Sequence, residues 1–293
     1  MEWTKQTRTM TRRGEETERI AARFGNVVVL ILIGMGGILM LLPFLWTFST
    51  SFRLASKSFE LPPQWLPTDF RTENYRVVFQ DLPFVHFFLN SLFIASMITI
   101  GQLITCSMAA FAFARLRFPG RNALFLVLLS GLMVPIQVTI IPLFIVVRIF
   151  HLLNSPWALI VPSLISAFGV FLLRQFFLTI PQEIEDAAKM DGASPFTIYW
   201  RIMLPLAGPG LSTLGIFTFN AHWNEYFRPL LFLSKFDQMT LPVGLVILRG
   251  YFGSGNLSAI LAGVTLAIIP VLIVFLLFQR FLVEGITLTG LKG

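Results

Sequence analysis

Charged residues, histidine and cysteine are scarce in this chain of 293 residues, and these shortages limit what the protein can be. Asp, Glu, Lys and Arg make up only 13% of the residues, 55% are hydrophobic, and the mean hydropathy is +0.76. A soluble globular domain carries about 25% charged residues, so this composition excludes one. Because the apolar residues form long runs without polar alternation, a transmembrane β-barrel is excluded as well.

The chain lacks the residue patterns of common catalytic and metal sites. Cys106 is the only cysteine and lies in an apolar run, which excludes an intrachain disulfide and a thiol metal site. His86, His151 and His222 are far apart and have no Cys or carboxylate neighbours at ligand spacing. No Gly-x-x-x-x-Gly-Lys-Ser/Thr sequence occurs, so we do not expect this chain to hydrolyse ATP. We therefore expect no enzyme activity, no metal site and no bound cofactor in this chain itself.

What the chain does have is six long runs without Asp, Glu, Lys or Arg. They are 24–52, 82–114, 122–147, 149–173, 202–224 and 250–279. About 20 apolar residues cross a hydrocarbon core of about 30 Å, so each run is long enough to span a membrane as a helix. Pro135, Pro142 and Pro162 lie inside these runs and predict bends. The expected fold is an all-α membrane protein with six transmembrane helices.

The distribution of basic residues predicts the orientation. Of the 22 Lys and Arg residues, fourteen lie in the N-terminal arm, in alternate gaps between runs, and in the tail. The other eight lie in the remaining gaps. Positive-inside counting places both termini, and the gap at 181–204, in the cytoplasm. Because the basic residues are dispersed, anchoring to membrane lipid is a better explanation of the net charge of +7 than binding to nucleic acid.

The chain divides into a charged cytoplasmic arm (1–25), a six-helix domain (26–281) and a cytoplasmic tail (282–293). The external loop 52–82 is rich in proline, with a short helix predicted from Thr72 as its cap. A second external loop, 235–256, is rich in glycine and is expected to be irregular.

The most polar interruption of the apolar sequence, 181–204, reads as two short helices joined at a glycine. Pro181 suits the first position of a helix, and Gly192 suits the left-handed backbone conformation that often ends a helix. Ser194 and Pro195 then predict the cap and first position of a second helix, which ends at Leu204-Pro205.

This segment is expected to dock a soluble partner. Ile184, Met190, Ile198 and Ile202 would be apolar anchors, and Glu185 and Asp186 would pair with basic residues of the partner. The alternative is an amphipathic helix on the lipid surface, but such helices are usually basic, and this segment is acidic.

The order Asp186-Ala187-Ala188, Gly192, Ile202 and Leu204-Pro205 resembles the "EAA" signature of ABC-importer permeases. The spacing is the same throughout, although the family usually has Glu where this chain has Asp186. Further segments resemble carbohydrate-importer permeases of the maltose type: 112–120, 133–135, 171–177, 223–225, 240–244, 279–285 and 291–293. The resemblance covers the chain from about residue 40 to its end.

This resemblance implies a permease subunit of a binding-protein-dependent importer for a sugar or sugar-like solute, with the type I ABC importer permease fold. It implies a homologous second permease, making a heterodimer, two copies of an ABC ATPase that hold ATP and Mg, and an extracytoplasmic solute-binding protein. The membrane would be the bacterial or archaeal cytoplasmic membrane. Glu185, Asp186, Ala187, Ala188, Gly192, Ile202, Leu204 and Pro205 would form the ATPase-coupling segment. The tail would extend toward the ATPases and loop 235–256 toward the binding protein.

Polar residues near the predicted outer ends of spans two and five are candidates for the substrate path: Asn90, Asn220, Trp223, Asn224 and Glu225. The alternative is a packing or gating cluster near the interface, which we favour because the resemblance to maltose-type importers implies that the partner permease supplies most sugar contacts. The alternative function is a secondary transporter or channel without ATPases, which predicts inverted repeats or buried acidic residues at mid-membrane. The sequence shows neither.

Overall fold

A computed structural model describes residues 3–58, 70–248 and 256–290 of the chain, with side chains described between 25 and 280. The described residues form helices and no strand. The α-helices are α1 (Trp3–Ser51), α2 (Glu73–Asp81), α3 (Phe84–Arg115), α4 (Arg121–Ser130), α5 (Ile136–Ile149), α6 (Trp157–Ile160), α7 (Ala167–Thr179), α8 (Gln182–Met190), α9 (Pro195–Ile198), α10 (Leu204–Leu206), α11 (Gly208–Trp223), α12 (Phe227–Phe232), α13 (Leu241–Ile247) and α14 (Leu257–Gly290). Shorter 3-10 segments are η1 (Ala55–Lys57), η2 (Gly131–Met133), η3 (Val161–Ser163) and η5 (Phe236–Gln238), and η4 (Tyr199–Met203) is a π-helix.

Three of the predicted spans are unbroken helices and three are bent pairs. Apolar segments of α1, α3 and α14 are each long enough to cross a membrane. The other three are bent pairs: Arg121–Met133 with α5 at 104°, Trp157–Ser163 with α7 at 41°, and Pro195–Leu206 with α11 at 75°. Among the described residues the count is therefore six when each bent pair is one span, as the sequence predicts.

Each bend has a local cause. Pro135 has an extended backbone and separates η2 from α5, because proline cannot donate the hydrogen bond that would continue the helix. Ser166 is also extended, and its side chain accepts a hydrogen bond from the N–H of Gly169 to start α7. Ala207 ends α10 before Gly208 and Pro209 start α11 in a new direction. Span five is shorter than predicted, because α11 ends at Trp223 and α12 is a separate helix.

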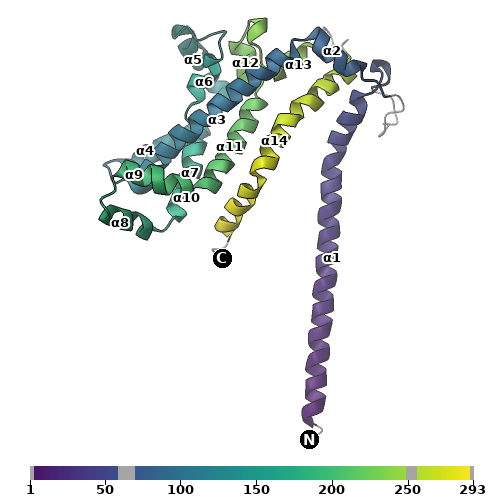
Figure 1. Cartoon of the computed structure of the whole chain (residues 1–293), viewed down its shortest axis with the longest axis vertical. Helices are drawn as coiled ribbons and strands as arrows, with labels where there is room; N and C mark the ends of the chain where they lie inside the picture. The colour runs from purple at the N-terminus through teal and green to yellow at the C-terminus, as the bar shows by residue number, and fades with distance from the viewer. Residues whose placement is uncertain (1–2, 59–69, 249–255, 291–293) are drawn as a thin grey trace.

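The packed body consists of α3, α7, α11 and α14, with α3 in contact with both α7 and α11 (Figure 1). Close approach depends on small residues. A Cβ added to Gly169 on α7 would lie 3.0 Å from the Cys106 sulfur on α3, and one added to Gly210 would meet the Phe176 ring at 2.6 Å. Glycine therefore allows these helices to contact each other directly.

Helix α1 stands apart from this body over most of its length (Figure 1). Most of its large apolar side chains between 27 and 48 are exposed, and only its last residues, 49–51, are buried. Among the described residues, nothing lies within 4 Å of a Cβ built on Gly34, Gly36 or Gly37. The predicted arm, 1–25, continues this helix from Trp3 rather than forming a separate segment. The absence of proline from the arm and its many Arg and Glu residues favour that continuation.

Loop 235–256 is less irregular than the sequence predicts, because α13 lies inside it. Leu241 and Val243 of α13 are buried, and Gly244 lies against the Phe87 ring of α3. Pro242 suits the first turn of this helix. The predicted short helix of loop 52–82 is confirmed as α2, but Thr72 makes no side-chain capping bond. The proline-rich part of that loop and residues 249–255 lie outside the described residues.

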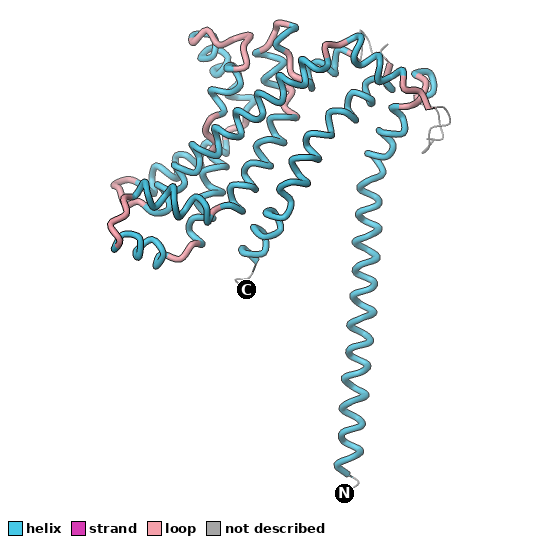
Figure 2. Tube along the Cα trace, viewed as in Figure 1, coloured by secondary structure: helices cyan, strands magenta, loops and turns pink. Residues whose placement is uncertain are grey.

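The elements sort to two ends of the molecule. Helices α8, α9 and α10 lie at the same end as the C-terminus, and α1 runs toward that side to its N-terminus (Figure 1). Helices α2, α12 and α13 lie at the opposite end (Figure 1), where Figure 2 shows several loops. The segment 181–204, which the distribution of Lys and Arg assigns to the cytoplasm, therefore lies at one end, and the described parts of the two predicted external loops lie at the other. We refer below to the α8 end and the α2 end.

Candidate functional site

The α8–α9 hairpin, residues 181–206, is turned by a glycine as the sequence predicts. Gly192 has φ +78°, a backbone conformation that residues with a side chain rarely adopt. Its N–H donates to the Lys189 carbonyl at 3.0 Å, and the N–H of Ala193 donates to the Ala188 carbonyl at 3.0 Å. These two bonds close a Schellman motif, which satisfies the last carbonyls of α8.

The second arm of the hairpin is capped at Ser194, also as predicted. The Ser194 hydroxyl accepts from the Thr197 N–H at 3.2 Å, and Pro195 occupies the first turn of α9. Two details differ from the prediction. Pro181 is the cap rather than the first residue of α8, and the helical arm continues through η4 past Pro205 to Leu206.

Glu185 fastens the hairpin to the body of the protein from within. Its residue is only 5% exposed, the Lys189 amine lies 2.8 Å from its carboxylate, and Arg115 Nε lies 3.8 Å away. Arg115 also donates to the carbonyls of Phe177 and Ile180 at the end of α7. The hydrogen bond to Glu185 raises the pKa of Lys189. The expectation that Glu185 pairs with a partner protein is wrong in this respect, because its partners lie in this chain.

Asp186, in contrast to the buried Glu185, is exposed on the surface of the hairpin. Its side chain is 57% exposed, and its contact is an ion pair of 3.4 Å with Lys189. Ala187 beside it is also exposed, whereas Ala188 is buried under α8. Of the eight predicted coupling residues, Asp186, Ala187, Gly192 and Pro205 are exposed, whereas Ile202 and Leu204 are partly buried.

The apolar surface of the hairpin differs from the predicted set of anchors. Ile198 is 1% exposed and packs in the chain's own core, so it is not an anchor for a partner. Of the predicted anchors, Met190 (85%) and Ile184 (39%) are exposed, and the other large exposed apolar side chains of the hairpin are Phe196 (64%), Trp200 (57%) and Leu206 (49%). Phe196 and Trp200 are not among the residues predicted from the sequence. Aromatic residues inside a polar segment are the signal that could have found them.

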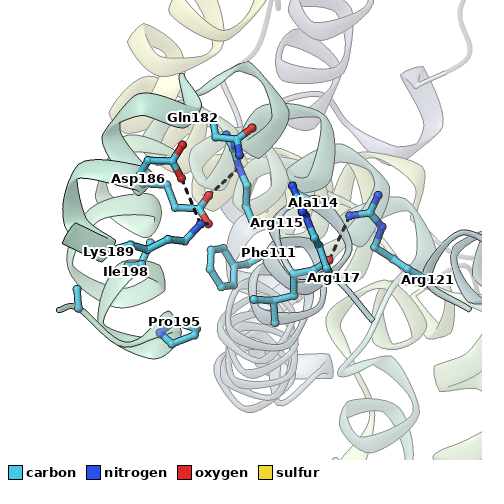
Figure 3. A pocket seen from close by; sticks show the side chains of 13 residues that line it. Phe111, Ala114, Arg115, Arg117, Arg121, Gln182, Asp186, Lys189, Pro195 and Ile198 are labelled. Carbon is cyan, nitrogen blue, oxygen red and sulfur yellow. Dashed lines mark hydrogen bonds and ion pairs between the residues drawn. The ribbon is translucent and has the colours of Figure 1, made fainter. Parts of the chain in front are cut away.

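A cavity of about 840 Å³ lies between the hairpin and the turn that joins α3 to α4 (Figure 3). Figure 3 shows Lys189 and Asp186 on the hairpin wall, facing Arg115, while Arg117 and Arg121 lie at the far side. The Arg121 side chain donates to the Leu116 carbonyl at 3.1 Å. The cavity is therefore polar, and most of its charged groups are basic.

The candidate path residues are not one cluster. Asn90 on α3 donates to the carbonyls of Asp237 and Met239, each at 3.0 Å, and so holds η5 in place. Trp223 is buried, and its indole N–H donates to the Ala267 carbonyl at 3.0 Å. These two side chains bind other parts of the chain, as the packing interpretation predicts.

Asn220 and Asn224 are exposed and lie next to each other at the end of α11. The Asn224 amide donates to the Asn220 carbonyl at 2.9 Å. Both line a cavity of about 660 Å³ formed with α13, α14 and Phe44 of α1. Of the five candidates, these two leave polar groups facing an open cavity.

Glu225 belongs to a buried polar network that the sequence analysis missed. Arg228 on α12 makes an ion pair with Glu225 and donates to the Ser163 hydroxyl at 2.7 Å. Gln102 on α3 donates to the Ser163 carbonyl at 2.7 Å. The network thereby joins η3, the break between α11 and α12, and α3. Nothing in the local sequence pairs Arg228 with Ser163, which is 65 residues away.

A protein-family model matches most of this chain, including the hairpin. Residues 101–287 match the model of the "binding-protein-dependent transport system inner membrane component" family, and this range includes the whole hairpin. The chain belongs to this family of permeases. The resemblance in the sequence is thereby confirmed, and so is the all-α membrane fold.

Relatives and a solved structure agree. The chain is 36% identical to an arabinooligosaccharides transport system permease protein, AraQ, of Halalkalibacterium halodurans, over 78% of this chain and 81% of the relative. It is 32% identical to the diacetylchitobiose uptake system permease protein NgcG of Streptomyces coelicolor, over 88% and 86%. It is also 32% identical to the sn-glycerol-3-phosphate transport system permease protein UgpE of Yersinia pestis, over 87% and 94%.

Among solved structures, a bacterial ABC transporter involved in the import of the acidic polysaccharide alginate matches with a TM-score of 0.77. The match has 25% sequence identity and covers 89% of this permease and 97% of that chain.

Proposed function

We propose that this permease is a subunit of an ABC importer for a sugar or sugar-like solute and that the α8–α9 hairpin couples it to a separate ATPase subunit. The observation that carries the proposal is the two-sided hairpin. One side is fastened to the body through Glu185 and Arg115, and Asp186, Met190 and Trp200 of the hairpin are exposed. A surface of this kind suits docking in a cleft of another protein.

The buried side explains how a movement would be transmitted. Arg115 lies at the end of α3 and binds the carbonyls that end α7, so a displacement of α8 acts on two spans together. Closure of two ATPases on ATP would draw the hairpins of two permeases together. The spans would then change between inward-facing and outward-facing states, and hydrolysis would reset them.

The exposed apolar surface of α1 suits contact with a second permease. Its apolar surface is exposed along 25–48 except for a few half-buried positions near its end, and Gly34, Gly36 and Gly37 leave room for another helix. The relatives are subunits of transport systems, so we infer a heterodimer of homologous permeases. Two ATPase subunits would hold ATP and Mg, and a solute-binding protein would deliver the solute.

The orientation follows from the charge distribution. The α8 end carries most of the basic residues, so it faces the cytoplasm together with both termini, in a bacterial or archaeal inner membrane. The α2 end then faces outward, toward the binding protein. Asn220 and Asn224 at that end would contact the hydroxyl groups of a passing sugar.

The test is purification of the tagged permease from native membranes in mild detergent, followed by mass spectrometry of the proteins that accompany it. The proposal requires an ATPase, a second permease and a solute-binding protein, and the binding protein's ligand would identify the solute. A homo-oligomer without an ATPase would overturn it in favour of a secondary transporter or channel.

A further inference from the structure

The cavity behind the α8–α9 hairpin has an excess of positive charge on one wall. The hairpin contributes Glu185, Asp186 and Lys189, and Lys189 makes ion pairs with both carboxylates. The turn from α3 to α4 contributes Arg115, Arg117 and Arg121. Among the described residues, Arg117 and Arg121 have no acidic partner, so the cavity is suited to an anion.

Hydrogen-bond donors on this wall are also left over. The Arg115 side chain is 8% exposed, and its Nε, which lies 3.8 Å from the Glu185 carboxylate, has no hydrogen-bond partner in the described part of the chain. The Arg117 side chain makes no hydrogen bond to the residues that the structure describes, and Arg121 makes one, to the Leu116 carbonyl. Guanidinium groups with spare N–H donors recognise phosphate oxygens, often through two bonds at once.

The wall continues directly into an apolar helix. Arg121 is the first residue of α4, and Leu124, Leu126 and Val127 of the same helix are exposed large apolar residues. A smaller hollow of about 430 Å³ lies where the two regions meet, lined by residues 117, 118 and 120–123. A molecule with an anionic head and an apolar tail can contact both the basic wall of the cavity and the apolar face of α4. An acidic protein side chain or a free anion would contact only the cavity.

We propose that the cavity binds the phosphate of an anionic ligand, and that the apolar face of α4 favours the headgroup of an anionic phospholipid over a soluble phosphate ester. Placing the lipid in the cytoplasmic leaflet rests on the proposed function. Because the Glu185–Lys189 pair forms the facing wall, an occupied cavity stiffens the base of the hairpin. Coupled ATPase activity then rises with the anionic lipid content of the membrane.

The test compares the wild-type complex with Arg117→Gln/Arg121→Gln, and with Arg148→Gln as the control. Arg148 is an exposed arginine in the last turn of α5, at the other end of a bent span.

Each complex, with all its subunits, is placed in nanodiscs of phosphatidylcholine with increasing phosphatidylglycerol. Retained phosphatidylglycerol is counted by native mass spectrometry after detergent extraction, and the ATPase rate is measured in the nanodiscs. A second arm adds inorganic phosphate and glycerol 3-phosphate to phosphatidylcholine nanodiscs.

Each basic residue near an anionic surface contributes about a fivefold preference, so the double variant should retain phosphatidylglycerol roughly 30-fold less well, with the control unchanged. Binding of the soluble phosphates alone would support the phosphate site and assign it a soluble source. Equal retention by the double variant, or equal loss in Arg148→Gln, would overturn the proposal. Entry of an ATPase side chain, shown by a crosslink to Arg117 that excludes lipid, would overturn it too. The proposed function is judged separately, by whether an ATPase accompanies the same preparations.

Discussion

Arg115 Nε and the Glu185 carboxylate lie 3.8 Å apart, although the two residues come from different helices and are separated by 70 positions in the chain. Both side chains are more than nine-tenths buried. The pair connects the hairpin to α3, and Arg115 connects it to the end of α7. These contacts fasten the hairpin to α3 and α7, so it is not a loose loop.

Glu185→Gln should loosen this connection. Removing one partner of a buried ion pair costs about 3–5 kcal/mol, and the lower end applies because Arg115 keeps two carbonyl partners. Thermal unfolding of the purified complex measures the loss. Glu183→Gln is the matched control, since Glu183 is exposed in the same helix and has no ion pair among the described residues. Equal stability of the two variants would show that the buried pair does not hold the hairpin.

Asp186→Lys should prevent ATPase docking while leaving membrane insertion intact, because it reverses the charge on the exposed side of the hairpin. Co-purification of the ATPase with the tagged permease provides the measurement, with Glu183→Lys as the control for a charge change on the same helix. Asp186→Glu, the residue usual in the family, should keep docking. An ATPase that still accompanies Asp186→Lys would contradict the coupling assignment.

Local features of the hairpin could be predicted from the sequence, and contacts between distant residues could not. Gly192 and Ser194 carry their own conformational preferences, so the corner and the cap follow from a few adjacent residues. Glu185 has no local feature that separates it from Asp186. Which of the two faces the body depends on where Arg115 lies, and that depends on the packing of α3 against α7.

The difference between local preferences and distant contacts also explains why the helix bends and the structure of loop 235–256 differ from the prediction. The apolar content of the six runs predicted the spans, but composition does not report the angle at Pro135 or Ala207. Loop 235–256 was expected to be irregular because of its glycines. Gly244 instead allows α13 to lie against Phe87, a contact that depends on a helix more than 150 residues earlier in the chain.

Gly192→Val should strain the corner of the hairpin. A left-handed backbone costs about 1–2 kcal/mol in a residue with a side chain, and branching at Cβ makes valine a poor choice there. We expect reduced transport per ATP hydrolysed, measured as solute uptake and ATPase rate in the same proteoliposomes. Gly192→Asn is the matched control, because asparagine tolerates this backbone. A Cβ at Gly192 would meet no other described residue within 4 Å, so the expected strain arises from the backbone conformation rather than from a contact of that Cβ with a neighbour. Normal coupling in the valine variant would show that the corner need not be left-handed.

Arg228→Gln should destabilise the α2 end, because it leaves the half-buried Glu225 without its arginine and Ser163 without a donor. The expected cost is about 3 kcal/mol in the unfolding free energy of the complex. The double variant Arg228→Gln/Glu225→Gln should recover part of it, since no unpaired charge then remains. A double-mutant cycle of thermal unfolding gives the coupling energy. Strictly additive losses would mean that the two side chains do not stabilise each other.

The exposed apolar surface of α1 would be costly in water and requires another surface in the assembly. Gly36→Leu adds a large side chain where this chain has nothing within 4 Å, so the fold of the permease itself should be unaffected. If a second permease packs on α1, the added side chain should lower the ratio of the two permeases after tagged purification by about fivefold or more, since overpacking an interface costs about 1–3 kcal/mol. Gly25→Leu is the control, because Gly25 is equally open but lies at the start of the span. An unchanged ratio in Gly36→Leu would mean that lipid, rather than a second permease, covers this face of α1.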